Sequence, residues 1–312
     1  MAQDKNQKTL NVPPLRFPGF KDEWERVKVS DLLNFYSTNS LSWEMLNYED
    51  GDIQNLHYGL IHSGLPTLID LQRDTMPFVN ETAKPKKFTL CKEGDIAFAD
   101  ASEDTNDVAK AVEFINLNGQ QVISGLHTIH GRDNENKTVL GFKGYAFASS
   151  AFHNQIRRIA QGTKIYSISS KSFDEVFISI PNKAEQTKIA RLLHLIDERI
   201  TTQNKIIDHL QSLIKGLNDS CHDNEQGEAI SFDELGHSYS GLSGKSGDDF
   251  GQGSPYITYL NVFQNYVVNE EQIGLVTVDD NESQNTISYG DVLFTLSSET
   301  PEETGIGCVY LG

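Results

Sequence analysis

The sequence has no long hydrophobic run and few cysteines. No stretch of its 312 residues approaches the roughly 18 apolar residues of a membrane span, and the N-terminus MAQDKNQKTL is polar, unlike a signal peptide. Cys91, Cys221 and Cys308 lie far apart, with no CxxC pair and no histidine at ligand spacing. This pattern is typical of reduced thiols, not of a zinc site or a disulfide framework. We therefore expect a cytoplasmic protein with no structural metal and no membrane partner.

Basic residues are scarce, above all in the last third of the chain. The formal net charge is −18. Residues 223–312 hold 16 acidic residues and one basic residue, Lys245, so they carry −15 and leave −3 for residues 1–222. Proteins that neutralise DNA phosphates usually display a surplus of Lys and Arg. If the chain binds DNA, the binding surface is expected in its first part.

Catalytic motifs are also missing from the sequence. Gly244 to Ser246 (GKS) resembles the end of a phosphate-binding loop, but Tyr239 stands where that loop needs glycine. We expect residues 240–253 to form a flexible acidic loop. No HExxH or GxSxG pattern occurs, and the nine histidines are scattered. Residue spacing therefore gives no candidate catalytic residue.

The region 12–182 mixes short β-rich runs with a few helical pieces. We expect strands at Arg26–Val29, Lys87–Leu90, Asp95–Ala99, Val112–Ile115, Gln121–Ile123 and Val176–Ile180, and helices at Ser30–Leu33 and Ala151–Ile159. The mixture predicts one compact domain of mixed α and β type. Residues 1–11 are polar and patternless and are expected to form a disordered tail.

A long amphipathic helix is predicted over residues 183–222. Residues recur at alternating steps of four and three and form the seam of a coiled coil, namely Ile189, Leu193, Ile196, Ile200, Gln203, Ile207, Leu210, Ile214 and Leu217. Pro181 precedes this helix, whereas Gly216, Asn218 and Asp219 predict its end. A helix packed on its own domain would show a similar stripe, but a seam of about four heptads favours a partner helix.

Beyond about residue 225 the pattern of the first domain begins again. GDIAF at 94–98, with Ser102 and Glu103, returns as GDVLF at 290–294, with Ser298 and Glu299, at an offset of 196 residues. The start of each unit, at 29–33 and 230–235, matches with a one-residue insertion. An internal duplication is the better interpretation, with 223–312 as a second, incomplete domain.

Two short segments carry a resemblance to a known family. LRFPGF at 15–20 with Trp24, and Ile180-Pro181 with EQTKIA at 185–190 opening the heptad helix, resemble the specificity subunit of type I restriction-modification enzymes. The QGT turn at 161–163 is also similar. The resemblance covers about residues 12–312 and is most specific around Pro181 to Ala190.

The resemblance implies two target-recognition domains of mixed α/β type (α+β), each followed by a long helix, with the helices paired as an antiparallel spacer. In this arrangement 12–182 is the first target-recognition domain, 183–222 the spacer helix and 223–312 part of the second domain. It implies a non-catalytic subunit that binds double-stranded DNA, reads one half of a bipartite target and docks methyltransferase and restriction subunits. S-adenosylmethionine would be bound by the methyltransferase subunit and no cofactor by this chain. Because the second helix is absent, we also expect a homodimer through the exposed seam.

Candidate DNA contacts come from the basic residues of the first domain. Arg and Lys can bridge guanine acceptors or phosphates, and a Lys-rich turn is also a common solvated loop. The candidates are Arg73, Lys84, Lys86, Lys87, Lys110, Arg157, Arg158 and Lys164. Tyr58, with His57 and His62, could stack on DNA or fill the interior.

Two rival hypotheses remain at this point. One is a coiled-coil interaction module whose acidic domain binds another protein, which the bias of residues 223–312 favours. The other is an enzyme of unknown class, which no motif supports. A DNA-binding protein should lose affinity steeply as salt rises, and this separates the first rival from the leading hypothesis.

Overall fold

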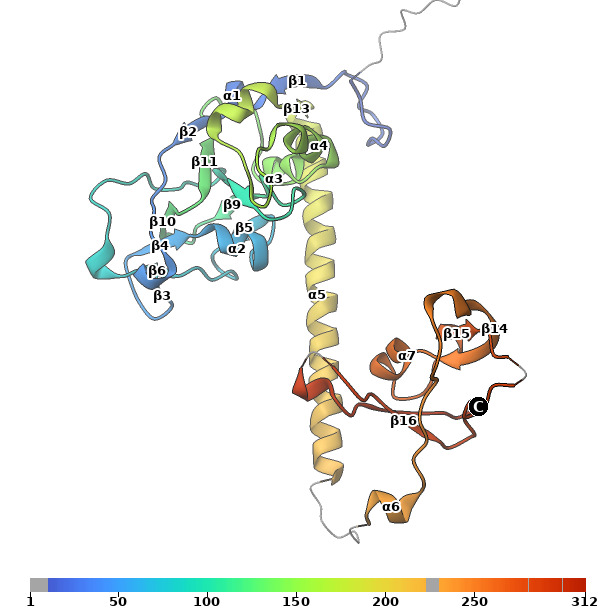
Figure 1. The fold of residues 1–312 in the computed structure, drawn as a ribbon. Helices are drawn as coiled ribbons and strands as arrows, with labels where there is room; N and C mark the ends of the chain where they lie inside the picture. The colour runs from blue at the N-terminus through green and yellow to red at the C-terminus, as the bar shows by residue number, and fades with distance from the viewer. Residues whose placement is uncertain (1–10, 223–229, 280, 299) are drawn as a thin grey trace, which may run out of the picture. The chain divides into compact units, whose positions relative to one another are not determined.

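The computed structural model describes residues 11–222, 230–279, 281–298 and 300–312, and it divides after Asn218 into two units (Figure 1). Residues 1–10, which hold most of the predicted disordered tail, lie outside the described part. Asn11 is described, and its backbone N–H donates to Glu23 while its side-chain amide donates to the Trp24 carbonyl. No helix in the described part is long and apolar enough to cross a membrane.

The first unit is built on a five-stranded sheet in the order β2-β11-β7-β9-β5. Neighbouring strands are antiparallel except β5 and β9, which are parallel. The strands are β2 (Asn34–Tyr36), β5 (Leu68–Asp70), β7 (Ile96–Ala99), β9 (Ala111–Asn116) and β11 (Thr128–Arg132).

A four-stranded sheet in the order β10-β4-β6-β3 lies in the same unit. Its strands are β3 (Leu46–Asn47), β4 (Ile53–Leu56), β6 (Phe78–Val79) and β10 (Gln121–Ser124), with β4 and β10 parallel. Two strand pairs complete the unit: β1 (Glu25–Lys28) with β13 (Phe177–Ile180), and β8 (Ala101–Ser102) with β12 (Tyr166–Ser167). Together these elements confirm the predicted mixed α/β fold class.

Helices cover the sheets and lead into one long final helix. The short ones are α1 (Val29–Leu32), α2 (Tyr58–Ser63), α3 (Phe142–Phe147) and α4 (Ser150–Ile159), with 3₁₀ turns η1 (Trp43–Met45), η2 (Glu81–Ala83) and η3 (Ser170–Glu175). The long helix α5 (Lys183–His222) leaves the body of the unit as a rod (Figure 1). Its 40 residues span about 60 Å at 1.5 Å per residue.

Strand β7 is buried on both faces, which places it at the centre of the unit. Its successive side chains alternate between two apolar clusters: Ile96 and Phe98 belong to one, Ala97 and Ala99 to the other. Phe98 packs against Phe147 of α3, with the ring centroids 4.9 Å apart. Side chains that alternate in direction and are all buried are expected of a strand between two covered faces.

Two local predictions, the strand at 87–90 and the loop at 240–253, are wrong. Residues 87–90 form no strand, because only Leu90 reaches a neighbour, Ile123, through an isolated bridge. Helix α5 has the predicted bounds 183–222, and Gly216 lies inside it, since Gly216 has no positive φ and does not cap the helix. The predicted loop at 240–253 enters a strand at Phe250.

The second unit contains two hairpin-like strand pairs. These are β14 (Phe250–Ile257) with β15 (Ile273–Val276), and β16 (Val292–Phe294) with β17 (Gly307–Val309). The helical pieces are α6 (Phe232–Leu235), α7 (Tyr259–Gln264), η4 (Gly247–Asp249), η5 (Glu270–Gln272) and η6 (Pro301–Glu303). A bulge in β14 needs Gly253, because a Cβ there would lie 2.5 Å from the Val276 carbonyl oxygen.

The duplication seen in the sequence recurs in backbone hydrogen bonds. Gly94 N–H donates to the Phe114 carbonyl at 2.7 Å, and Gly290 N–H donates to the Tyr310 carbonyl at 2.7 Å. The register of β7 on β9 repeats in β16 on β17, with every partner shifted by 196 residues. Both glycines have a positive φ, which glycine adopts without strain. The repeated sequence therefore builds the same strand pair twice.

Candidate functional site

Two of the eight predicted DNA-contacting cations are neutralised by carboxylates of their own unit. Arg73 lies 3.1 Å from Glu198 of α5, and Lys84 Nζ lies 2.7 Å from Asp52 and 2.6 Å from Glu81. The hydrogen bond from Lys84 lowers the pKa of Asp52 below its ordinary value. Charges compensated in this way contribute little to phosphate binding.

Two further predicted cations donate to uncharged groups. Lys110 Nζ lies 3.0 Å from the backbone oxygen of His62 at the end of α2. The Arg157 guanidinium on α4 donates to the side-chain oxygens of Asn106 and Asn154. These contacts tie Lys110 to α2, and Arg157 to the loop that follows β8 and to its own helix.

The remaining four, Lys86, Lys87, Arg158 and Lys164, are exposed and form no ion pair within the described residues. Lys86 and Lys87 lie between η2 and β7, close in the chain to Lys84. Arg158 lies on α4, and Lys164 follows in the turn before β12. These four cations thus fall in two parts of the chain, one between η2 and β7 and one around α4 and the turn before β12.

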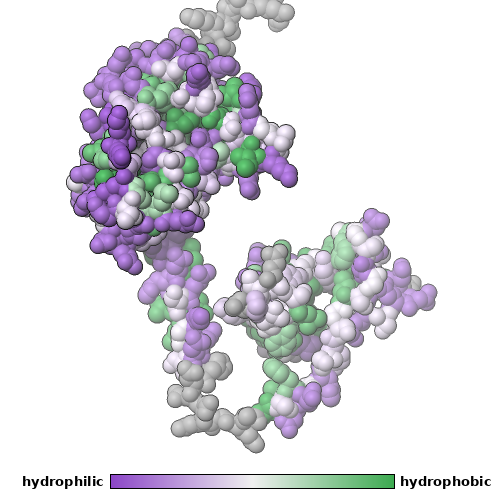
Figure 2. Space-filling model, turned by 60° about the vertical axis from the view of Figure 1, so that its left-hand side comes forward, coloured by the Kyte–Doolittle hydropathy of each residue, from purple (hydrophilic) through white to green (hydrophobic). Residues whose placement is uncertain are grey.

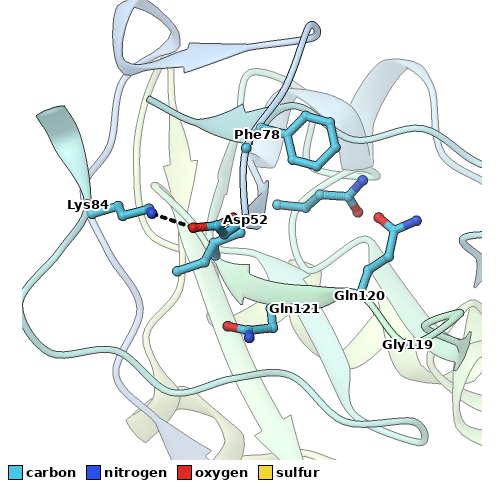
Figure 3. A pocket seen from close by; sticks show the side chains of 9 residues that line it. Asp52, Phe78, Lys84, Gly119, Gln120 and Gln121 are labelled. Atoms are coloured by element: carbon cyan, nitrogen blue, oxygen red, sulfur yellow. Dashed lines mark hydrogen bonds and ion pairs between the residues drawn. The ribbon is translucent and has the colours of Figure 1, made fainter. Parts of the chain in front are cut away.

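A polar pocket of about 520 Å³ opens beside Lys84 (Figure 3). It lies where the parallel strands β4 and β10 begin, and its lining includes Asp52, Gln54, Phe78, Gln120 and Gln121. Figure 3 shows the Lys84–Asp52 ion pair on one side of the pocket and the Phe78 ring and Gln120 on the other. These glutamines belong to no motif of the sequence. The local sequence signal for this pocket is the AsnGly turn at 118–119, shortly before strand β10.

His57 has a structural role at the start of α2. Its Nδ1 accepts the Gly59 N–H at 3.2 Å, and its ring packs in a tilted arrangement against Trp43, with centroids 4.3 Å apart. Burial, with a smaller contribution from His127, lowers the pKa of His57. His57 therefore fills the interior, whereas Tyr58 is partly buried against the core.

The two segments that carry the family resemblance meet at the start of α5. Arg16 donates to both carboxylate oxygens of Glu185 at 2.7 Å, with the Glu185 side chain 1% exposed. Lys188 Nζ lies 4.9 Å from the Phe20 ring centroid and 5.9 Å from that of Phe17. A bidentate charged pair fixes orientation as well as distance. The N-terminal segment therefore clamps the first turns of the helix.

Further contacts fasten α5 to the same unit. Buried Gln186 accepts the Val139 N–H at 2.8 Å and donates to the Lys137 and Pro181 carbonyls. Tyr145 donates to Asp197 at 2.7 Å, and burial together with this bond raises the pKa of the Tyr145 hydroxyl. The helix is thus held over more than three turns before it leaves the domain.

The predicted seam divides at this junction. Ile189 packs against the domain's own core and Leu193 is half-buried. From Arg199 to Cys221 every residue of α5 is exposed, so the seam from Ile196 onward forms an exposed apolar face. Figure 2 shows part of this face beside hydrophilic side chains. Gln203 lies within this exposed face.

One buried polar cluster has spacing that could hold a metal ion: Cys91, Asp95 and His130. Both Asp95 oxygens already accept hydrogen bonds, from Arg132 at 2.6 and 2.7 Å and from His130 at 2.7 Å. Burial alone would raise the pKa of Asp95, but these bonds outweigh it and hold the pKa below its ordinary value. The guanidinium occupies the position of a cation, so we interpret the cluster as structural.

Comparison with known proteins gives one family match. A family model described as "Type I restriction modification DNA specificity domain" matches residues 21–212. No curated protein matches the chain.

Three solved structures are similar in parts. The S subunit of a type I restriction-modification system from M. genitalium is 16% identical, with a TM-score of 0.47, over 88% of this chain and 66% of that one. A type I R-M structure described for complex assembly and conformational transition is 14% identical (TM-score 0.43; 65% and 46%). The HsdS subunit from Thermoanaerobacter tengcongensis is 14% identical (TM-score 0.42; 68% and 46%). The chain thus spans less than two thirds of the length of each.

Proposed function

This chain belongs to the family of type I restriction-modification DNA specificity domains, and from that premise we propose that it is a specificity subunit that reads one half of a bipartite DNA target. Its partners are double-stranded DNA, methyltransferase subunits and restriction subunits. The chain itself is not a catalyst and binds no cofactor, and S-adenosylmethionine is bound by the methyltransferase subunit.

The observation that carries this proposal is the junction between domain and helix. A reading domain that must act at a fixed distance along a duplex needs a rigid connection, because a flexible linker would let it drift. The Arg16–Glu185 clamp and the Gln186 contacts make the first turns of α5 part of the domain body. The exposed face from Ile196 to Leu217 then pairs with a second helix, which for the isolated chain is that of a second copy.

The test is methylation by a reconstituted complex. The chain is mixed with its methyltransferase subunit and duplexes of random sequence, and incorporation of methyl groups is mapped. We expect methylation at one recurrent sequence, and none by the chain alone. Methylation that ignores sequence would refute the proposal.

The acidic second unit favours a second candidate function, a coiled-coil module that binds another protein. Binding measured over a salt series separates the two functions. For a DNA-binding chain log K falls linearly with log salt, with a slope of about −0.9 for each phosphate contact. Absence of DNA binding at low salt would favour the protein-binding module.

A further inference from the structure

The polar lining of the pocket beside Lys84 is explained neither by the Lys84 ion pairs nor by the packing of the hydrophobic core. Parallel pairing of β4 and β10 sets Gln121 opposite Ile53, and so brings the turn at 119–120 next to Gln54. The two segments are more than 60 residues apart in the chain. Together with Phe78 of β6 they build an open polar concavity at the start of both strands.

Two glutamine side chains in this pocket lack hydrogen-bond partners. Gln54 is 5% exposed, and neither its Oε1 nor that of Gln120 receives a donor from the described residues. A buried acceptor without a donor costs free energy, so such atoms are normally paired. The terminal torsion of glutamine is broad, and each amide can therefore turn to present its oxygen or its nitrogen to a ligand.

The charges around the pocket favour an uncharged ligand over a phosphate. The Lys84 ammonium is shared by Asp52 and Glu81, so this trio carries a net negative charge. A phosphate would be repelled here, whereas an amino group of a base would be attracted. Lys86 and Lys87, two and three residues further on and exposed, remain available for the backbone phosphates beside it.

We propose that this pocket receives the edge of an adenine and that Gln54 and Gln120 read it. The inference rests on the proposed DNA-reading function and names residues that determine its specificity. A glutamine amide matches adenine because its oxygen accepts from the N6 amino group while its nitrogen donates to N7. Phe78 forms the apolar wall of the pocket against which the base edge packs.

The experiment is selection of duplexes from a randomised pool by the full 312-residue chain. Wild type is compared with Gln120→Met and Gln54→Met, which keep side-chain length and remove the amide. Gln72→Met is the matched control, since Gln72 is an exposed glutamine of the same unit outside the pocket. Thermal unfolding verifies that each variant is folded, and Gln120, on a turn, can be tested even if Gln54→Met unfolds.

We expect wild type and the Gln72→Met control to select an adenine at one position, and Gln120→Met to lose about 5- to 150-fold of that preference. Low-salt, sequence-independent affinity should stay unchanged. Gln120→Glu should shift the preference toward cytosine, because a carboxylate accepts a hydrogen bond from the N4 amino group of that base.

Two outcomes separate this inference from the proposed function. If wild type selects a sequence and both pocket variants select the same one, the inference is refuted while the proposed function stands. If wild type selects no sequence at all, both are refuted. Loss of methyltransferase binding in the variants, with DNA selection intact, would show a protein-binding pocket and also refute the inference.

Discussion

The exposed seam of α5 allows a quantitative test of helix pairing by the substitution Ile200→Asp. Six apolar seam residues, Ile196, Ile200, Ile207, Leu210, Ile214 and Leu217, are 44–64% exposed. Complete burial of such a side chain contributes about 1.5–3 kcal/mol, so burying the exposed half contributes about 1 kcal/mol. A pair of helices therefore gains about 12 kcal/mol.

That gain is comparable to the cost of association, about 4–15 kcal/mol, so the dimer is only moderately stable. Ile200→Asp removes about 2 kcal/mol from the pair and adds two carboxylates to an apolar interface. Because each 1.4 kcal/mol is a factor of ten, the dissociation constant should rise by at least about 30-fold.

The assay is sedimentation equilibrium over about 1–100 μM, with helicity followed by circular dichroism. Ser212→Asp is the matched control, because it adds the same charge to the exposed helix on the heptad face opposite the seam. A wild-type chain that stays monomeric over this range, or an Ile200→Asp variant that dimerises as wild type does, would refute the reasoning.

Three further predictions concern the junction, the core and the DNA contacts. Glu185→Gln should destabilise the first unit by about 3 kcal/mol, because it leaves the Arg16 guanidinium without its charged partner. Urea unfolding measures the loss of stability, and an unchanged unfolding midpoint would contradict the prediction. Burial lowers the pKa of His153, so the unfolded chain binds the proton at a higher pH than the folded chain does. The free energy of unfolding should therefore fall as pH drops below about 6.5, and it should fall less in His153→Leu. Lys87→Ala should reduce the salt slope of DNA binding by about 0.9, whereas Lys84→Ala should leave it unchanged, since Lys84 is already paired with a carboxylate. Equal slopes for the two variants would contradict the idea that the ion pair keeps Lys84 from contacting phosphate.

The sequence predicted those parts of the fold that depend on neighbours in the chain. Strand β7 begins within one residue of its predicted start, because the turn at Gly94 and Asp95 is a local signal. Helix α4 follows from a local apolar stripe. Helix α5 reaches its predicted end at 222 and does not stop at Gly216, because a single glycine costs only about 1 kcal/mol, which continuing helical hydrogen bonds outweigh.

The site was less predictable because distant segments create it. Lys84 could be recognised as a cation, but its partner Asp52 lies 32 residues away, and Glu198 lies 125 residues from Arg73. The pocket glutamines are brought together by strand pairing that no local pattern specifies. By contrast, the motif residues Arg16 and Glu185 were found separately through the resemblance, and only the structure shows that they bind each other.

The repeated turn before β7 and β16 is closed by the same side-chain contact in both copies. At both places an aspartate accepts a backbone N–H three residues earlier, Lys92 for Asp95 and Ser288 for Asp291. In the first copy Asp95 also accepts hydrogen bonds from His130 and Arg132, both of β11. One carboxylate in the first copy therefore joins its turn to a strand 35 residues further on, so its loss would loosen the turn and the pairing of β7 with β11 together.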